Sequence, residues 1–206
     1  MKHLIIVANG EPPVPSQHWR RIRQADPLVC TDGAANFLLE RDIIPDVVIG
    51  DLDSLEEDYR ARLTEQHIRH VPSQENTDLE KAIDYAIGQG YTAATILGAT
   101  GKREDQTLAN LYLLVKYAPR IHLQLLTNYS AIDAVTDTIS LRVEPGQVIS
   151  LLPVGRAEGI TTGGLKYPLQ DETLEVGSRG VSNQAMESEI TISLQSGALL
   201  LFRNFR

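Results

Sequence analysis

Two aspartates, Asp51 and Asp53, directly follow a short apolar run that ends at Gly50. Carboxylates two positions apart on a turn can converge on one Mg²⁺, which prefers oxygen ligands and bridges phosphate oxygens. A structural role also fits, because residues 54–57 (Ser-Leu-Glu-Glu) have the pattern of a capping box, and an aspartate before a helix complements the helix dipole. The segment taken alone leaves a metal site and a capped helix start equally open.

Polar residues also follow the other apolar runs of the first 130 residues. In open α/β sheets, ligands bind at the carboxyl ends of the strands, so residues in these positions are candidates for a site. We therefore expect carboxylates and basic side chains to gather at one edge of the sheet. Besides Asp51 and Asp53, these residues are Asp32, Gln74, Asp78, Lys102, Arg103, Asp105 and Asn128.

Residues 77–80, Thr-Asp-Leu-Glu, form a second possible capping box in front of a helical pattern. Helix capping accounts for Thr77 and Glu80 but requires neither Gln74 nor Lys81. Lys81 lies one turn along, where its ammonium group could reach a phosphate at the helix N-terminus. A solvated lysine is the more common outcome, so both interpretations of Lys81 stay open.

The stretch GATGKREDQ, residues 98–106, superficially resembles a P-loop. A P-loop has four residues between its first glycine and the Gly-Lys pair, followed by Ser or Thr. Here only two residues separate Gly98 from Gly101, and Arg103 follows Lys102, so the motif does not match. The stretch predicts a turn that presents Lys102 and Arg103 at a helix start, either as an ordinary polar loop or as a bidentate clamp on phosphate oxygens.

The elements that position these residues fall into two regions of the sequence with different patterns. Up to about residue 128, apolar runs at 3–9, 27–33, 46–51, 68–73, 93–99 and 122–128 alternate with helical patterns. Such continuous apolar runs are typical of parallel strands that are buried on both faces. Alternation of strand and helix predicts a doubly wound α/β domain with a mostly parallel sheet, which we place at residues 1–130.

From about residue 131 the helical patterns stop. Short strand-like segments separated by turn residues indicate an antiparallel β-sandwich, which we place at residues 131–206. A domain of this size has marginal stability on its own, so we expect contacts with the first domain, with a second chain or with both to stabilise it. The strand-like segments are 131–143, 147–154, 165–169, 173–176, 188–194 and 197–203.

Composition excludes some classes of function. The 206-residue chain has a formal net charge of −8 and no block of Lys or Arg, so it does not have the charge of a nucleic-acid-binding protein. No apolar run approaches the length of a membrane span, so we expect no membrane partner. Cys30 is the only cysteine, which rules out an internal disulfide and is consistent with a cytoplasmic protein.

Several motifs, taken in order, resemble the thiamine pyrophosphokinase (thiamine diphosphokinase) family. They are TDGAAN, PDVVIGDLDS, QENTDLEKA, GATGKREDQTLANL, GGLKYPL and GVSN, and they extend over nearly the whole chain. The resemblance implies transfer of a diphosphate from ATP to the hydroxyl of thiamine, giving thiamine diphosphate and AMP, with Mg²⁺ as cofactor. It also implies a nucleotide-binding α/β domain, a thiamine-binding β-sandwich, and a homodimer with thiamine near the subunit interface.

The resemblance also implies residue roles. Either Asp78 or Asp105 would accept the proton of the thiamine hydroxyl, and the sequence does not choose between them. Two departures from the family pattern are Gln106, where many relatives have histidine, and Lys102, where many have glycine. By position, Asp51, Asp53 and Asp78 match the family's carboxylates for Mg²⁺ and phosphate, and Asp32 matches its Asp-Gly motif. The polar positions around the nucleotide match Gln74, Lys81, Arg103 and Asp105, and the thiamine side matches Tyr167, Ser182 and Asn183. Lys102 and Asn128 are substrate-binding candidates from their places after the strands.

Two alternatives from other classes remain. An apolar strand followed by Asp-x-Asp also opens haloacid-dehalogenase-like phosphatases, in which the first aspartate, here Asp51, is a nucleophile. That motif usually follows the first strand, whereas here it follows the third, and the β-rich second half does not fit that plan. A nucleotide- or thiamine-binding regulatory module would be no enzyme, and it would not need the carboxylates Asp51, Asp53 and Asp78.

Overall fold

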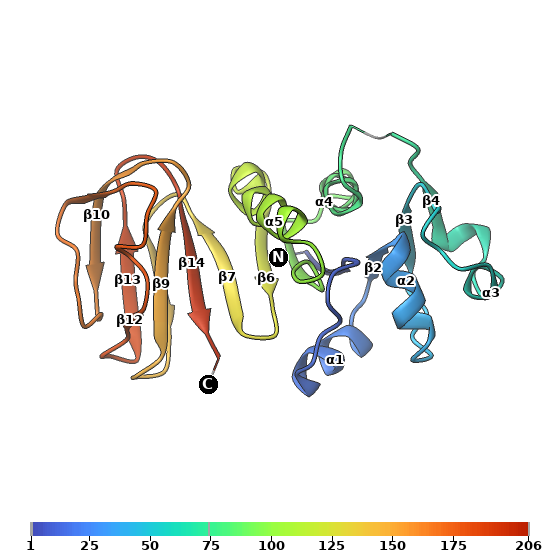
Figure 1. Ribbon diagram of the computed structural model, residues 1–206, viewed down its shortest axis with the longest axis horizontal. Coiled ribbons are helices and arrows are strands. Elements are labelled where there is room, and N and C mark those ends of the chain that lie inside the picture. Colours follow the sequence, from blue (N-terminus) through green and yellow to red (C-terminus); the bar gives the residue numbers. More distant parts are fainter. Residues whose placement is uncertain (1, 74, 206) are drawn as a thin grey trace. The chain divides into compact units, whose positions relative to one another are not determined.

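The computed structural model describes residues 2–73 and 75–205, so the predicted site residue Gln74 lies outside the described residues. The chain divides into two compact units (Figure 1). The first comprises the chain up to Leu113 together with Pro119–Asn128, and the second comprises Leu114–Ala118 and the chain from Tyr129 onward.

The first unit is built from alternating strands and helices, as the apolar runs predicted. The last residues of its α5 helix are grouped with the second unit. In chain order its elements are β1 (His3–Val7), α1 (Ser16–Arg23), β2 (Leu28–Thr31), α2 (Asp32–Leu39), β3 (Val47–Gly50), α3 (Glu57–Arg60), the 3₁₀ helix η1 (Glu65–His67), β4 (Ile68–His70), α4 (Asp78–Gly88), β5 (Ala93–Leu97), α5 (Glu104–Tyr117) and β6 (His122–Leu126).

The six strands form a parallel sheet in the order β6-β5-β1-β2-β3-β4. Every residue of β2, β3 and β5 is buried, because helices cover both faces of the sheet. Right-handed crossovers place α1 and α2 on one face and α4 and α5 on the other, and Figure 1 shows these pairs in blue and green. The doubly wound α/β architecture is therefore confirmed.

The order of strands reverses between β1 and β5, which are neighbours although 85 residues separate Val7 from Ala93 in the chain. Val7 pairs with Leu97 at the carboxyl ends of these two strands. In open α/β sheets this switch point opens a crevice in which ligands bind. The fold therefore places the segments after β1 and β5 at the position expected for a site.

The two predicted helix caps have different outcomes. Thr77 is the N-cap of α4, and its hydroxyl accepts a hydrogen bond from the Glu80 backbone N–H at 3.3 Å. The capping box at Ser54 is wrong, because α3 begins three residues later at Glu57 and no side chain caps it. Leu55 is buried in the irregular segment before the helix, and the Ser54 hydroxyl donates to Asp53 instead.

The second unit is an antiparallel sandwich, as predicted. One side contains β12-β9-β14-β7 and the other contains β11-β10-β13-β8, in these orders. Leu199 and Leu201 from the first side and Ile190 and Ile192 from the second belong to one buried core. The strands are β7 (Ser130–Val135), β8 (Ile139–Arg142), β9 (Val148–Pro153), β10 (Ala157–Gly163), β11 (Glu172–Leu174), β12 (Asn183–Gln184), β13 (Glu189–Ser193) and β14 (Leu199–Asn204).

Two details of this unit differ from the sequence prediction. Residues 165–169 are not a strand, because Leu165 makes only an isolated bridge to Ala185 and Pro168 has no N–H to donate. The sequence pattern missed β10, which is rich in Gly and Thr and buried at only some of its positions.

In the described part of the chain, no helix is long and apolar enough to cross a membrane.

Candidate functional site

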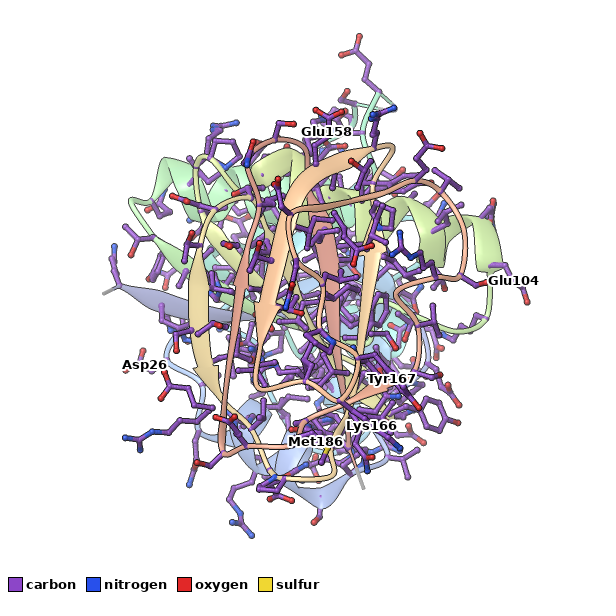
Figure 2. The ribbon with its side chains drawn as sticks, turned by 90° about the vertical axis from the view of Figure 1, so that its left-hand side faces the viewer. Asp26, Glu104, Glu158, Lys166, Tyr167 and Met186 are labelled. Carbon is purple, nitrogen blue, oxygen red and sulfur yellow. The ribbon has the colours of Figure 1, made fainter. Side chains whose placement is uncertain are left out.

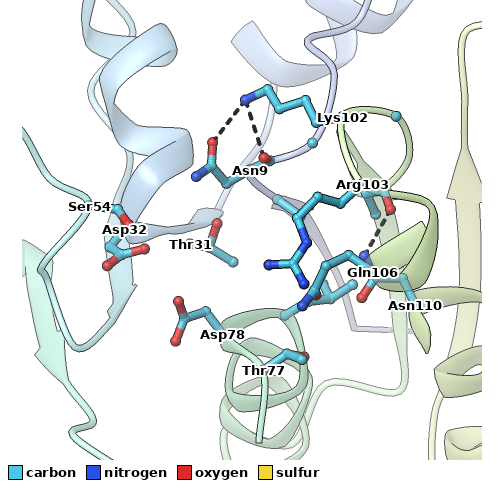
Figure 3. Close-up of a pocket in the computed structure, with 15 residues that line it drawn as sticks. Asn9, Thr31, Asp32, Ser54, Thr77, Asp78, Lys102, Arg103, Gln106 and Asn110 are labelled. Carbon is cyan, nitrogen blue, oxygen red and sulfur yellow. Dashed lines mark hydrogen bonds between the residues drawn. The ribbon is translucent and has the colours of Figure 1, made fainter. Parts of the chain in front are cut away.

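A cavity of about 410 Å³ lies at the carboxyl ends of β1, β2 and β5 in the first unit (Figure 3). Carboxylates and basic side chains line it together, as the sheet-edge argument predicted. Asp51 and Asp53 are absent from its lining, although Asp51 approaches it from the end of β3. The lining residues are Ala8, Asn9, Gly10, Thr31, Asp32, Ser54, Thr77, Asp78, Leu79, Ala99, Gly101, Lys102, Arg103, Gln106 and Asn110.

Three carboxylates converge beside this cavity. Asp32, Asp51 and Asp78 each contribute an oxygen, and these oxygens lie within 4.8 Å of one another. Asp32 opens α2, Asp51 follows β3 and Asp78 opens α4, so three separate elements build the cluster. Asp53 lies next to this cluster, where its backbone N–H donates to Asp51 Oδ1 at 3.3 Å.

The Asp32 carboxylate is held in place by backbone groups. Its Oδ1 accepts from the Gly33 N–H at 2.6 Å and its Oδ2 accepts from the Leu52 N–H at 3.1 Å. Burial raises the pKa of Asp32 to about 6, and the nearby carboxylates of Asp78 and Asp51 add to this shift, although the Gly33 hydrogen bond opposes it. Crowded carboxylate oxygens fit a hard divalent cation, which would offset their mutual repulsion.

Basic side chains lie on the opposite side of the cavity from Asp32, as Figure 3 shows. Lys102 Nζ donates to the backbone oxygen of Asn9 at 3.3 Å and to its side-chain oxygen at 3.2 Å. Lys102 also has a φ of 60°, which is unusual for a residue with a side chain. A strained residue at a cavity wall is typical of functional sites, where the surrounding structure maintains the strain.

Arg103 lines the cavity and forms a bidentate ion pair with Asp105, with distances of 3.1 Å from Nε to Oδ1 and 2.5 Å from the terminal nitrogen to Oδ2. This hydrogen bonding lowers the pKa of Asp105 and raises the pKa of Arg103. Asp105 itself does not line the cavity, whereas its neighbour Gln106 does.

Two other predicted residues, Lys81 and Asn128, do not line the cavity. Lys81 is buried, and its Nζ donates to Asp78 Oδ1 at 2.8 Å, so it orients a carboxylate of the cluster. Asn128 Oδ1 accepts from the Val14 N–H at 2.7 Å and so ties down the segment after β1.

Comparisons with known proteins decide the family. Models described as thiamin pyrophosphokinase, catalytic domain, and thiamin pyrophosphokinase, vitamin B1 binding domain, match residues 19–125 and 136–199. A thiamine pyrophosphokinase from Bacillus subtilis is 30% identical over 176 residues, covering 81% of this chain and 82% of that protein. Thiamin pyrophosphokinase 1 from Caenorhabditis elegans is 26% identical over 211 residues, covering 94% and 85%. The chain belongs to the thiamin pyrophosphokinase family.

Structural similarity agrees with this assignment. The crystal structure of thiamine pyrophosphokinase from Bacillus subtilis matches with a TM-score of 0.84 at 27% identity, covering 100% of both chains. The chain is therefore an enzyme of the thiamin pyrophosphokinase kind, as the ordered motifs predicted. The interpretations as a haloacid-dehalogenase-like phosphatase and as a non-enzymatic module are not supported.

The residues predicted for the thiamine side lie in the second unit, within the match to the family's vitamin B1 binding domain. Asn183 Oδ1 accepts from the Tyr167 N–H at 3.0 Å, and Asn183 Nδ2 donates to the Tyr167 carbonyl at 2.7 Å. Tyr167 is 62% exposed, and Figure 2 shows it at the surface of this unit. The Ser182 N–H donates to Ser150 Oγ at 3.0 Å. The structure thus brings Tyr167 and Asn183 together, and the Asn183 amide holds the backbone of Tyr167.

Sequence reasoning missed several residues that line the cavity of this thiamin pyrophosphokinase family member. Asn9 and Gly10 follow β1, so the sheet-edge rule that found the other candidates would also have found them. Thr31 was found by that rule as part of the Thr-Asp-Gly segment after the second predicted strand, although it was given no role. Asn110 lies inside a regular helical pattern, where nothing local distinguishes it from an ordinary structural residue.

A substitution at Gly50 tests the position of Asp32. A Cβ at this residue would lie 2.8 Å from Asp32 Cγ, so the Asp32 carboxylate must move. We expect Gly50→Ala to lower kcat by about 10- to 100-fold, because small displacements of reacting groups cost this much. Gly88→Ala is the matched control, since a Cβ there meets nothing within 4 Å at the end of α4. Steady-state kinetics check this, and equal kcat values for the two variants would contradict it.

Proposed function

We propose that the chain transfers a diphosphate from ATP to the hydroxyl of thiamine with Mg²⁺ as cofactor, giving thiamine diphosphate and AMP. One observation carries this proposal: the carboxylate cluster of Asp32, Asp51 and Asp78 lies beside a cavity that Lys102 and Arg103 also line. Diphosphate transfer needs alignment and charge neutralisation more than covalent chemistry, and this arrangement offers both signs of charge around one cavity.

The proposed metal ligands are Asp51, Asp53 and Asp78, together with Asp32, which the geometry adds to the set predicted from the sequence. Oxygen donors alone in this number suit Mg²⁺, which retains several waters and binds substrate phosphates. When bound, Mg²⁺ would neutralise charge on the phosphate oxygens. Lys81 would act indirectly, by holding the Asp78 carboxylate in orientation.

The chain's own residues align the reaction in this proposal. Lys102 and Arg103 bind phosphate oxygens, and Gln74 and Asn128 remain predicted nucleotide-handling residues. The thiamine hydroxyl oxygen attacks the β-phosphorus, the bond between that phosphorus and the α,β-bridging oxygen breaks, and AMP leaves with the bridging oxygen. The hydroxyl proton passes to a carboxylate. Of the two candidates we favour Asp78, which lines the cavity, over Asp105, whose lowered pKa makes it a weaker base.

On the thiamine side, we propose that Tyr167 faces the cationic thiazolium ring, because aromatic faces attract cations. Ser182 remains a predicted thiamine contact, and Asn183 supports Tyr167 through its two backbone hydrogen bonds. A homodimer and a cytoplasmic location also remain part of the proposal, and analytical ultracentrifugation would test the first.

The proposed reaction is tested by the identity of the nucleotide product. Incubation with ATP, Mg²⁺ and thiamine is expected to give AMP and thiamine diphosphate in equal amounts, and omission of thiamine is expected to abolish AMP formation. Chromatography of the products measures both. ADP as the product would contradict diphosphate transfer. Thiamine-independent phosphate release with a phosphorylated Asp51 would support a phosphatase, and thiamine binding without ATP consumption would support a binding module.

A further inference from the structure

Two buried side-chain oxygens in the cavity wall have no hydrogen-bond partner among the residues that the structure describes. They are Thr31 Oγ1 and Asn110 Oδ1, on residues that are 3% and 7% exposed. Buried polar groups in folded proteins are almost always paired, because an unpaired one is costly. An unpaired oxygen in the wall of a cavity therefore has an acceptor position that a ligand atom can fill.

The orientation of the Asn110 amide is determined by its neighbour. Asn110 Nδ2 donates to the backbone oxygen of Ala99 at 2.8 Å, and a carbonyl oxygen can only accept. The amide nitrogen must therefore face Ala99, which leaves Oδ1 as the unpaired atom. Asn110 lies in α5 while Ala99 follows β5, so this bond ties the helix to the strand end at the switch point of the sheet.

An unpaired amide oxygen discriminates between ligand groups. It accepts a hydrogen bond, so its partner must be an O–H or N–H group, and the oxygens of ionised phosphates do not qualify. The Thr31 hydroxyl can both donate and accept, so it does not select in this way. Within ATP, the available neutral donors are the ribose hydroxyls and the amino group of adenine, and all of these belong to the nucleoside.

We propose that Asn110 is a specificity-determining residue whose Oδ1 accepts a hydrogen bond from the nucleoside part of ATP, a ribose hydroxyl or the base amino group. This inference rests on the proposed function, because it takes ATP as the substrate. It gives the cavity two regions, with the carboxylates and basic side chains around the phosphates and Asn110 at the nucleoside.

The test compares ATP with analogues that each lack one donor: 2′-deoxy-ATP, 3′-deoxy-ATP, and a purine riboside triphosphate without the amino group. For the wild type, the analogue that lacks the donor bound by Asn110 is expected to lose about 10- to 100-fold in kcat/KM. In Asn110→Ala this ratio is expected to fall to within about threefold, because ATP itself then gains nothing from that donor. Thr95→Val is the control, because the Thr95 hydroxyl is buried but pairs with His3 and does not line the cavity, and this variant is expected to leave the ratio unchanged.

Calorimetric Kd values for the same nucleotides give a second readout that does not depend on turnover. If the wild type uses all three analogues as well as ATP, the inference is overturned without any variant, while AMP production keeps the proposed function intact. A selectivity ratio unchanged in Asn110→Ala would also overturn it. The same holds if the wild type loses kcat/KM when the amino group of thiamine is replaced by an oxo group and Asn110→Ala does not, because Asn110 would then bind thiamine. If the wild type neither binds ATP nor forms AMP, both the inference and the proposed function fail.

Discussion

Replacing Asp51 or Asp78 by asparagine is expected to lower kcat for AMP formation by about 10³-fold, corresponding to about 4 kcal/mol of lost transition-state stabilisation. Each carboxylate contributes an oxygen to the cluster with Asp32, and an amide that replaces it removes a negative charge from the metal site. For Asp78, the substitution also removes the charge of its ion pair with Lys81, because an amide oxygen can still accept from Lys81 Nζ but is neutral.

Two measurements check this result. The first is the rate of AMP release, and the second is the thermal stabilisation of the protein by Mg²⁺, which follows ligand affinity by mass action. Asp84→Asn is the matched control, because Asp84 lies on the same helix α4, pairs with Arg120 at 3.6 Å and does not belong to the carboxylate cluster. Near-normal AMP release in any two of Asp51→Asn, Asp53→Asn and Asp78→Asn would reject the carboxylate metal site.

Asp32→Asn is expected to abolish activity measured with Mg²⁺. In the absence of divalent cations, the same variant is expected to be more stable than the wild type at pH 7.5. The pKa of Asp32 rises from 3.8 to about 6 in the folded protein, so the folded state binds a proton more tightly than the unfolded state. The free energy of unfolding therefore falls as pH rises between these two values, by at most about 3 kcal/mol. Asparagine removes this penalty but keeps only one of the two backbone hydrogen bonds, so we expect a net gain of about 1–2 kcal/mol.

Denaturant unfolding at pH 3.5 and pH 7.5 with a chelator measures this effect. The wild type is expected to lose stability relative to Asp32→Asn on going from the lower to the higher pH. Added Mg²⁺ is expected to restore the stability of the wild type but not that of the variant. Parallel pH profiles for the two proteins would show that the Asp32 carboxylate carries no penalty, and Asp84→Asn again controls for the loss of one acidic group.

Local patterns in the sequence were sufficient for much of the fold. The continuous apolar runs predicted strands buried on both faces, and β2, β3 and β5 are buried throughout. The pattern from Leu79 to Ala86 predicted the buried face of α4, and Thr77 caps that helix. These predictions succeeded because periodicity and capping depend on neighbours in the chain. Where burial is only partial, as in β10, the same signal failed.

The sequence by itself determined the family, the two-part architecture and the polar segments at the strand ends, because ordered motifs and apolar periodicity are properties of the chain. Only the tertiary structure decided which of those polar residues meet. It put Asp32 beside Asp51 and Asp78, buried Lys81 against Asp78, and left Asn110 with an unpaired oxygen in the cavity wall. These outcomes depend on strand register and helix placement, such as the pairing of Thr31 with Ile49, which bring together groups far apart in the chain.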